Sequence, residues 1–179
     1  MVKKIVGTGV LLVLALALQA GVKMYTLKSP DGKVKLEVTA GQGIAYSLFY
    51  DGRLLLKPSR IALHTDLPEA DHWENIRITG TKQRHVSETV QAPFYRVKEF
   101  GIDCNELELR LNNGFSLLMR AYNDGMAYRF VAGRKGEMTV VEERAEFNFA
   151  DDFEAYIPYS TNPKDPWNMA FQNFYTKAP

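Results

Sequence analysis

The chain has 179 residues, of which 46% are hydrophobic, and its 22 basic and 21 acidic residues leave a formal net charge of +1. Because the two signs are interspersed along the chain, the composition argues against a nucleic-acid-binding surface, and we expect a small or neutral partner. The single cysteine, Cys104, excludes an internal disulfide. No histidine lies near it in the sequence, so we expect a buried structural thiol rather than a nucleophile.

The N-terminus has the pattern of a secretory signal peptide. Lys3 and Lys4 precede an apolar run from Ile5 to Leu18, which ends at Ala20-Gly21. The run is shorter than the roughly 20 apolar residues of a spanning helix, although a retained N-terminal anchor is the alternative. We therefore expect a signal peptide over residues 1–20, one domain over residues 21–179, export to the periplasm of a Gram-negative bacterium, and no membrane partner once the leader is removed.

Strand patterns begin soon after the leader. Apolar and charged residues alternate from Val34 to Val38, which is typical of a half-buried strand. The segments Ile44–Tyr50 and Arg53–Leu56 flank Asp51-Gly52, and this pair favours a two-residue hairpin turn. We expect Pro58 to end the second of these strands.

The segment Leu63–Asn75 is polar and acidic, which predicts an exposed loop. Two histidines and three acids make a metal site worth considering, namely His64, Asp66, Glu69, Asp71 and His72. Their spacing matches no metal-binding motif, so a solvated loop is the preferred interpretation. A further strand is expected over Ile76–Thr89, with His85 on its surface.

The most regular stretch is Leu107–Val131, which predicts three consecutive antiparallel strands. Apolar residues recur at every second position, and Asn113-Gly114 and Asp124-Gly125 interrupt the pattern. Asn, Asp and Gly tolerate the positive φ angles of tight hairpin turns, so both pairs indicate hairpins. Such a meander needs a second layer to cover its apolar face.

Another strand is expected over Thr139–Phe149. Its acids Glu142, Glu143 and Glu146 raise the possibility of paired catalytic carboxylates, but Arg144 interrupts them and favours a salt-linked outer face. No window after the leader has helical periodicity with caps. The predicted fold is therefore an all-β, antiparallel β-sandwich, with a barrel as the alternative.

The last segment, Tyr156–Tyr175, is dense in aromatic residues, amides and proline. Aromatic rings stack on sugar rings while amides bind hydroxyl groups, so this composition suits carbohydrate binding. Aromatic residues are equally common at interfaces between domains. The composition alone favours neither interpretation.

A resemblance to a known family carries the interpretation further. The succession SPDGKVKLEV, IAYSLFYDGRLLLKPSRIAL, RAYNDGMAYRF (Arg120–Phe130) and EERAEFNF (Glu142–Phe149) resembles the N-terminal domain of glycoside hydrolase family 97. The resemblance implies a galactose-mutarotase-like β-super-sandwich in an exported bacterial α-glucosidase or α-galactosidase. It also implies that the catalytic carboxylates lie on a (β/α)8 barrel, so we assign no catalytic residue here. Because the chain ends at Pro179, we expect a fragment or truncated gene product that is inactive alone.

The resemblance and the tail composition together suggest binding residues. The partners implied are an α-linked oligosaccharide and the barrel domain, and the proposed substrate-binding residues are Trp167, Asn168 and Asn173. The family also holds calcium through glutamates, one of them from this domain. Gln172 stands where that glutamate is expected, and it offers only a neutral carbonyl oxygen. The alternative function is a stand-alone carbohydrate-binding or structural β-sandwich without catalysis.

Overall fold

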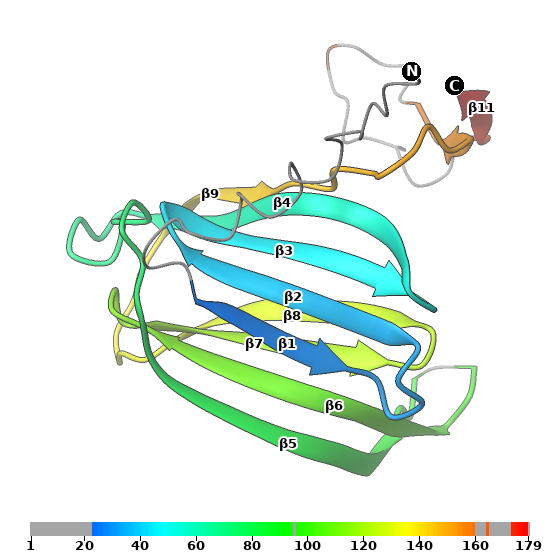
Figure 1. Cartoon of the computed structure of the whole chain (residues 1–179), viewed down its shortest axis with the longest axis horizontal. Coiled ribbons are helices and arrows are strands. Elements are labelled where there is room, and N and C mark those ends of the chain that lie inside the picture. The colour runs from blue at the N-terminus through cyan, green and yellow to red at the C-terminus, as the bar shows by residue number, and fades with distance from the viewer. Residues whose placement is uncertain (1–22, 95, 160–163, 165–172, 179) are drawn as a thin grey trace, which may run out of the picture.

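The computed structural model describes residues 23–94, 96–159, 164 and 173–178. Two antiparallel sheets lie face to face, and a short two-stranded ribbon near the C-terminus stands apart from them (Figure 1). The described residues form strands and turns without any helix. None of them therefore forms a helix that could span a bilayer.

The five-stranded sheet contains, in spatial order, β1 (Met24–Lys28), β2 (Val34–Gly41), β3 (Gly43–Tyr50), β4 (Arg53–Thr65) and β9 (Val140–Ala145). The four-stranded sheet contains β5 (Ile78–Gln91), β6 (Glu99–Leu111), β7 (Phe115–Tyr122) and β8 (Gly125–Ala132). The ribbon pairs β10 (Ala155–Ile157) with β11 (Thr176–Ala178). This arrangement confirms the predicted all-β sandwich, and the alternative of a closed barrel is wrong.

The predicted meander is confirmed as β6, β7 and β8, which pair as successive neighbours. At its first turn Gly114 supplies a positive φ of 83°, as expected for a tight hairpin. At the second turn Tyr122 pairs with Gly125, so the two connecting residues are Asn123 and Asp124. Gly125 already belongs to β8 and does not adopt a positive φ, so the predicted hairpin is confirmed with its turn one residue earlier.

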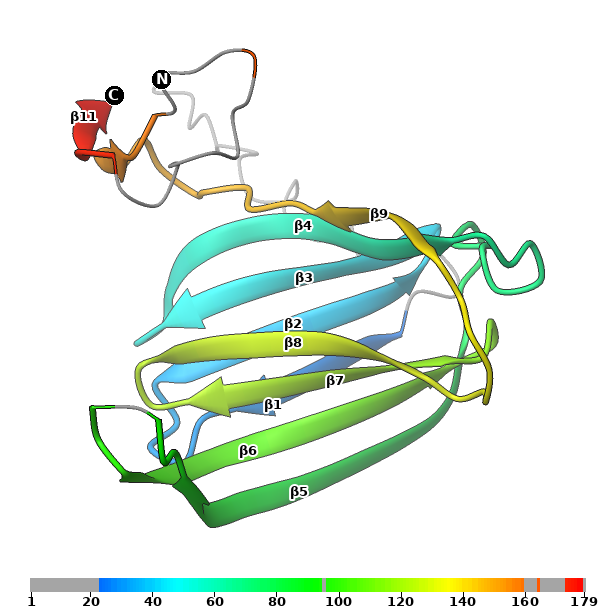
Figure 2. The ribbon, with the colours of Figure 1, turned by 180° about the vertical axis from the view of Figure 1, so that it is seen from behind.

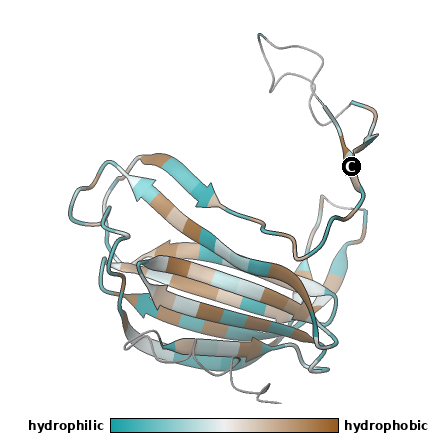
Figure 3. Ribbon diagram, turned by 45° about the horizontal axis from the view of Figure 1, so that its top comes forward, coloured by the Kyte–Doolittle hydropathy of each residue, from teal (hydrophilic) through white to brown (hydrophobic). Residues whose placement is uncertain are grey.

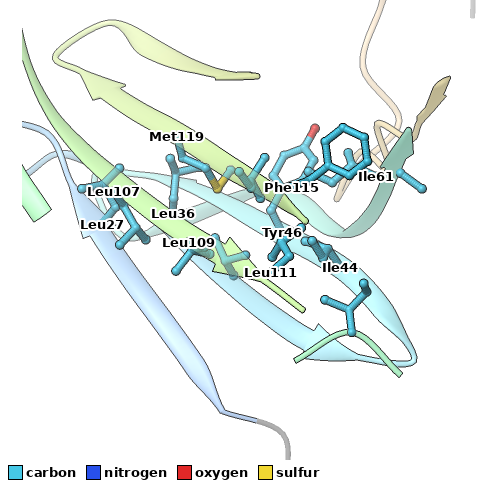
Figure 4. Packing of buried hydrophobic residues seen from close by; sticks show 14 of the residues in the cluster. Leu27, Leu36, Ile44, Tyr46, Ile61, Leu107, Leu109, Leu111, Phe115 and Met119 are labelled. Atoms are coloured by element: carbon cyan, nitrogen blue, oxygen red, sulfur yellow. The ribbon is translucent and has the colours of Figure 1, made fainter. Parts of the chain in front are cut away.

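The core lies between the two sheets. Hydrophobic and hydrophilic residues alternate along many of the strands (Figure 3). From the four-stranded sheet, Leu109, Leu117 and Met119 have no exposed surface. Leu109 and Met119 lie close to Leu36 and Tyr46 of the five-stranded sheet (Figure 4). Burial of apolar surface contributes about 25 cal/mol per Å², so this layer is the main stabilising element of the fold.

Strand β4 runs through Pro58, and the prediction that Pro58 ends it is wrong. The pairing of β3 with β4 shifts register between Tyr46, opposite Ser59, and Leu48, opposite Leu56. Proline lacks the N–H that a regular ladder needs, so it is accommodated where a β-bulge has already interrupted the ladder. The strand therefore continues to Thr65 and can pair with β9.

The polar segment that follows β4, residues 66–75, forms a cap over one end of the core. The prediction of an exposed loop over Leu63–Asn75 is therefore wrong. Ala70 and Trp73 are only 5% and 7% exposed. The Trp73 ring stacks on Phe115 at 6.1 Å and meets Phe130 edge-on at 5.2 Å, while its Nε1 donates to the Leu63 carbonyl oxygen over 3.0 Å. The sequence pattern missed this cap because its two buried residues are isolated among polar ones.

Glu106 forms the centre of a charged cluster on the outer face of the four-stranded sheet. It is 4% exposed and accepts hydrogen bonds from Arg84 Nε at 2.7 Å and from Arg120 Nε at 2.8 Å. Arg84 and Arg120 are its direct cross-strand neighbours on β5 and β7. Burial alone would raise the pKa of the Glu106 carboxyl, but the two guanidinium groups outweigh it and hold the pKa below its usual value.

Replacing Trp73 tests the cap. Trp73→Ala should lower the free energy of unfolding by about 3–5 kcal/mol, because it empties a buried site and removes two aromatic contacts. The neighbouring exposed His72 is the control, and His72→Ala should change the free energy by less than about 0.5 kcal/mol. Urea unfolding of both variants decides the matter, and equal midpoints would show that the cap does not stabilise the core.

Replacing Glu106 tests the charged cluster. Glu106→Gln should cost about 2–3 kcal/mol at neutral pH, because two charge-assisted hydrogen bonds to a buried group are lost. Since folding lowers the pKa of Glu106, its contribution is present above the unfolded pKa of about 4.3 and is lost as the pH falls through the lower folded pKa. The difference between wild type and variant should therefore shrink on acidification. Glu88→Gln, an exposed acid on β5, should show neither effect, and a pH-independent cost for Glu106→Gln would contradict this account.

Candidate functional site

The C-terminal ribbon holds the ends of the aromatic tail together. Ala155, Tyr156 and Ile157 of β10 pair with Ala178, Lys177 and Thr176 of β11. An ion pair between Glu154 and Lys177 reinforces this pairing. The two strands lie apart from the sandwich and join the two ends of the segment between them (Figure 2).

Of the predicted binding residues, Asn173 alone is described, whereas Trp167, Asn168 and Gln172 lie outside the described residues. Asn173 Nδ2 donates to the Tyr159 carbonyl oxygen over 2.8 Å, which ties the two sides of the connection together just beyond the ribbon. A primary amide has two donors and two acceptor lone pairs, so this bond engages only part of its capacity. The Asn173 side chain therefore links residues 159 and 173, and its role in substrate binding stays a prediction.

Aromatic residues on the ribbon and next to it are largely exposed. The exposed fractions are 63% for Tyr156, 54% for Tyr159, 97% for Phe174 and 69% for Tyr175. Large apolar rings gathered on one segment and left bare are typical of a binding surface. Both a sugar ring and another protein domain fit such a surface, so the structure keeps the two alternatives that the composition raised.

Four of the five residues considered for a metal site are engaged in structural contacts, and His72 is exposed. His64 Nδ1 lies 2.8 Å from Asp71 Oδ1, and Glu69 pairs with Arg134 at 2.7 Å. Asp66 accepts the backbone N–H of Thr139 at 2.9 Å, and this bond lowers the pKa of its carboxyl. Within the described parts of the chain, no three such side chains gather as a metal site would require. The calcium expectation at Gln172 stays a prediction.

The acids predicted for the strand Thr139–Phe149 make different contacts. Glu146 accepts the backbone N–H of Arg60 at 2.9 Å and the Arg144 Nε at 2.8 Å, and these bonds lower its pKa. The predicted salt link is thereby confirmed for Glu146. Glu143 instead faces the other sheet and accepts the Tyr128 hydroxyl at 3.1 Å. Neither arrangement is that of a catalytic carboxylate pair.

A groove of about 480 Å³ runs between β1 and the strands β5 and β6. The sequence did not predict that side chains of β5 and β6 bind the edge of β1 there. Gln83 Nε2 donates to the Thr26 carbonyl oxygen over 3.0 Å, and Asn105 Nδ2 donates to that of Lys28 over 2.9 Å. These amides satisfy the outward carbonyl groups of the edge strand β1. His85, exposed as predicted, pairs with Asp103 at 3.0 Å. The polar side chains in this groove therefore protect the edge of β1, and we do not assign a ligand site to it.

Cys104 is fully buried, which confirms the structural interpretation of this thiol. Burial raises its pKa, and a thiol that stays protonated is a poor nucleophile.

Comparison with known proteins places these features in a family. The family model described as Glycosyl-hydrolase 97 N-terminal matches residues 27–179. A retaining alpha-galactosidase of Bacteroides thetaiotaomicron is 39% identical over 167 residues, which is 90% of this chain and 25% of the relative. The chain thus spans about a quarter of the length of that relative.

Two solved structures share the fold. A beta-arabinopyranosidase superposes with a TM-score of 0.72 at 22% identity, over 85% of this chain and 26% of that one. A Glycoside Hydrolase Family 97 enzyme from Pseudoalteromonas sp. strain K8, in complex with panose, superposes with a TM-score of 0.62 at 18% identity, over 74% and 22%. Together with the match of the family model over most of the chain, these similarities show that the chain belongs to glycoside hydrolase family 97 and represents its N-terminal β-sandwich domain.

Proposed function

We propose that this chain acts as the N-terminal domain of an exported α-glycosidase that hydrolyses α-galactosides with retention of configuration. The observation that carries the proposal is the 39% identity, over 90% of the chain, with a retaining alpha-galactosidase. Export rests on the leader pattern at residues 1–20. An α-glucosidase is the second candidate, supported by the Pseudoalteromonas enzyme that binds panose.

The role proposed for this domain is support of the catalytic domain rather than chemistry. A glycosidase needs a general acid whose pKa is raised so that it stays protonated near neutral pH. Among the described residues, every carboxyl group with a displaced pKa is shifted downward, namely Asp31, Asp66, Glu69, Glu106 and Glu146. These groups are held ionised by hydrogen bonds, which is the state of structural acids.

The aromatic tail is the proposed meeting point with the catalytic barrel and the substrate. Its ends are fixed by the β10–β11 ribbon and by the bond from Asn173 to Tyr159. Exposed rings at Tyr159, Phe174 and Tyr175 supply the apolar surface that either contact requires. In this proposal Trp167, Asn168 and Asn173 line the sugar side of the segment.

The chain alone should hydrolyse neither p-nitrophenyl α-galactoside nor p-nitrophenyl α-glucoside. The physical reason is that the described carboxyl groups with a displaced pKa, such as Glu106 and Glu146, are held ionised, whereas a proton donor needs a raised pKa. Product release over a day at pH 5–8 measures the outcome. Turnover that persists after repurification and disappears when one acid of this chain is replaced would contradict the proposal.

The tail is tested in a longer protein in which this domain is joined to a family 97 catalytic domain. There Trp167→Ala should lower kcat/KM for an α-galactoside by roughly tenfold or more, because an aromatic contact to substrate or barrel is lost. Lys82→Ala, on an exposed face of β5, is the control and should leave both kcat/KM and Tm unchanged. Equal kcat/KM and Tm values for the two variants would show that the tail belongs neither to the substrate site nor to the domain contact. Tight binding of α-galacto-oligosaccharides by the isolated chain would favour a stand-alone binding module instead.

A further inference from the structure

A small hollow lies over the neighbouring strands β7 and β8, which run side by side in Figure 2. Its volume is about 160 Å³. Pockets that enclose a drug-sized molecule measure about 300–1,000 Å³, so this hollow has room for one chemical group of a larger ligand. The residues that line it are Leu118, Arg120, Tyr122, Ala127, Tyr128 and Arg129.

The hollow belongs to the outer face of the four-stranded sheet. Leu118, Arg120 and Tyr122 alternate along β7 with buried core residues, so their side chains point away from the core. Ala127 and Arg129 alternate in the same way along β8 with residues that pack against the core. The site is therefore separate from the hydrophobic layer, and a change there does not disturb the packing of the two sheets.

The register of the two strands explains why there is open space. Ala127 lies directly opposite Arg120, and Arg129 lies directly opposite Leu118. The methyl group of Ala127 is short, so it leaves a gap between the two long arginine side chains. Two arginines thus border a space that no side chain of the pairing fills.

The two arginines differ in how they are held. Arg120 Nε donates to Glu106 Oε2 at 2.8 Å, which fixes this side chain on the sheet. A guanidinium group carries five N–H donors, so this bond engages only one of them. Arg129 is exposed and makes no ion pair or side-chain hydrogen bond with any described residue. Both therefore have donors to offer to a ligand.

The charges around the hollow are positive in sum. The charged cluster combines the carboxylate of Glu106 with two guanidinium groups, so it keeps one positive charge in excess. Arg129 adds a second positive charge. Glu108, the other acid of β6 on this face, lies directly opposite Lys82 of β5. Among the described residues, no acid lines the hollow itself.

This arrangement suits a carboxylate on a partly apolar ligand. A carboxylate accepts two parallel hydrogen bonds from a guanidinium group, and such charge-assisted bonds are about twice as strong as neutral ones. Leu118 and Tyr122 offer apolar surface beside the arginines, and the C–H face of a sugar ring packs against surfaces of this kind. A neutral sugar would contact only the apolar part of the site.

We propose that the hollow is a binding subsite for an acidic sugar, a hexuronate whose carboxylate lies between Arg120 and Arg129. The ring of the sugar packs on Leu118 and Tyr122. The choice of a sugar as the carrier of the carboxylate rests on the proposed function in glycoside hydrolysis. The subsite binds without chemistry and recognises an acidic unit carried by a galactoside-containing substrate.

The test is a titration of the chain with galacturonate at constant ionic strength, followed by NMR through the backbone amides of Ala127 and Arg129 and the Arg129 side-chain Nε. Saturable shifts should give a Kd on the order of 1 mM, as a few charge-assisted bonds to an open site allow. Galactose lacks the carboxylate and acetate lacks the ring. Each should bind at least about tenfold more weakly than galacturonate, because each loses one part of the contact.

Three variants at exposed positions separate the site from general charge attraction. Arg129→Gln should raise the Kd for galacturonate by about tenfold or more, because a charged donor is lost. Ala127→Leu should have a similar effect without any change of charge, because the leucine side chain fills the hollow. Arg110→Gln is the matched control, since Arg110 is an exposed arginine of β6 outside the hollow. It should change the Kd by less than about twofold, because attraction between exposed separated charges is largely screened by salt.

Each outcome decides the proposal independently of catalysis. An unchanged Kd in Arg129→Gln or in Ala127→Leu would overturn the subsite, and so would an equal loss in Arg110→Gln. Acetate that binds as tightly as galacturonate would overturn the assignment of a sugar. Binding of galacturonate by a chain whose joined form hydrolyses no α-galactoside would uphold the subsite and refute the proposed activity. Hydrolysis by the joined protein without binding of galacturonate by the chain would do the reverse.

Discussion

The packing of β6 and β7 against β2 and β3 is the interaction on which the rest of the structure depends. Leu109, Leu117 and Met119 on one side and Leu36 on the other are wholly buried, so the two sheets cannot separate without exposing their largest apolar surface. Every other feature of the sandwich is arranged around this layer. The cap closes one end of it, and the outer face of β6 is then free to carry charge.

The charged cluster on that outer face shows how a buried acid is tolerated in a two-layer fold. Glu106 has almost no contact with water, and an isolated carboxylate in such a place would be strongly unfavourable. Arg84 and Arg120 compensate because the register places both directly beside it on neighbouring strands. The ion pairs connect three strands of the sheet and help to fix their register, whereas the apolar layer alone fixes only which face is inside.

The functional character of the domain follows from where its polar groups are used. Carboxylates such as Asp66, Glu106 and Glu146 hold loops and strands together, and exposed aromatic residues lie just after β9, on the ribbon and next to Asn173. A domain with satisfied acids and bare aromatic surfaces is suited to contact with another body. These features agree with an N-terminal domain whose relatives in the family are several times longer than this chain.

The sequence by itself determined the strands of the meander, the hairpin at Asp51-Gly52 and the family, because alternation and turn residues act over a few positions and need no distant partner. Asp51 and Gly52 both adopt the positive φ angles that such a turn requires. The tail was singled out from composition, whereas the bond from Asn173 to Tyr159 joins residues fourteen positions apart and could not be read from it.

Only the tertiary structure determines how Pro58, Trp73, Gln83 and Glu106 are accommodated, buried or hydrogen-bonded. Pro58 is tolerated because β3 shifts register beside it, and Trp73 is buried because Phe115 and Phe130 stand beneath it. The roles of Gln83 and Glu106 depend on strands that are 57 and 22 residues away in the chain. Local sequence carries the preference of each residue for a strand or a turn, but burial and hydrogen bonding depend on which distant segments the folded chain brings together.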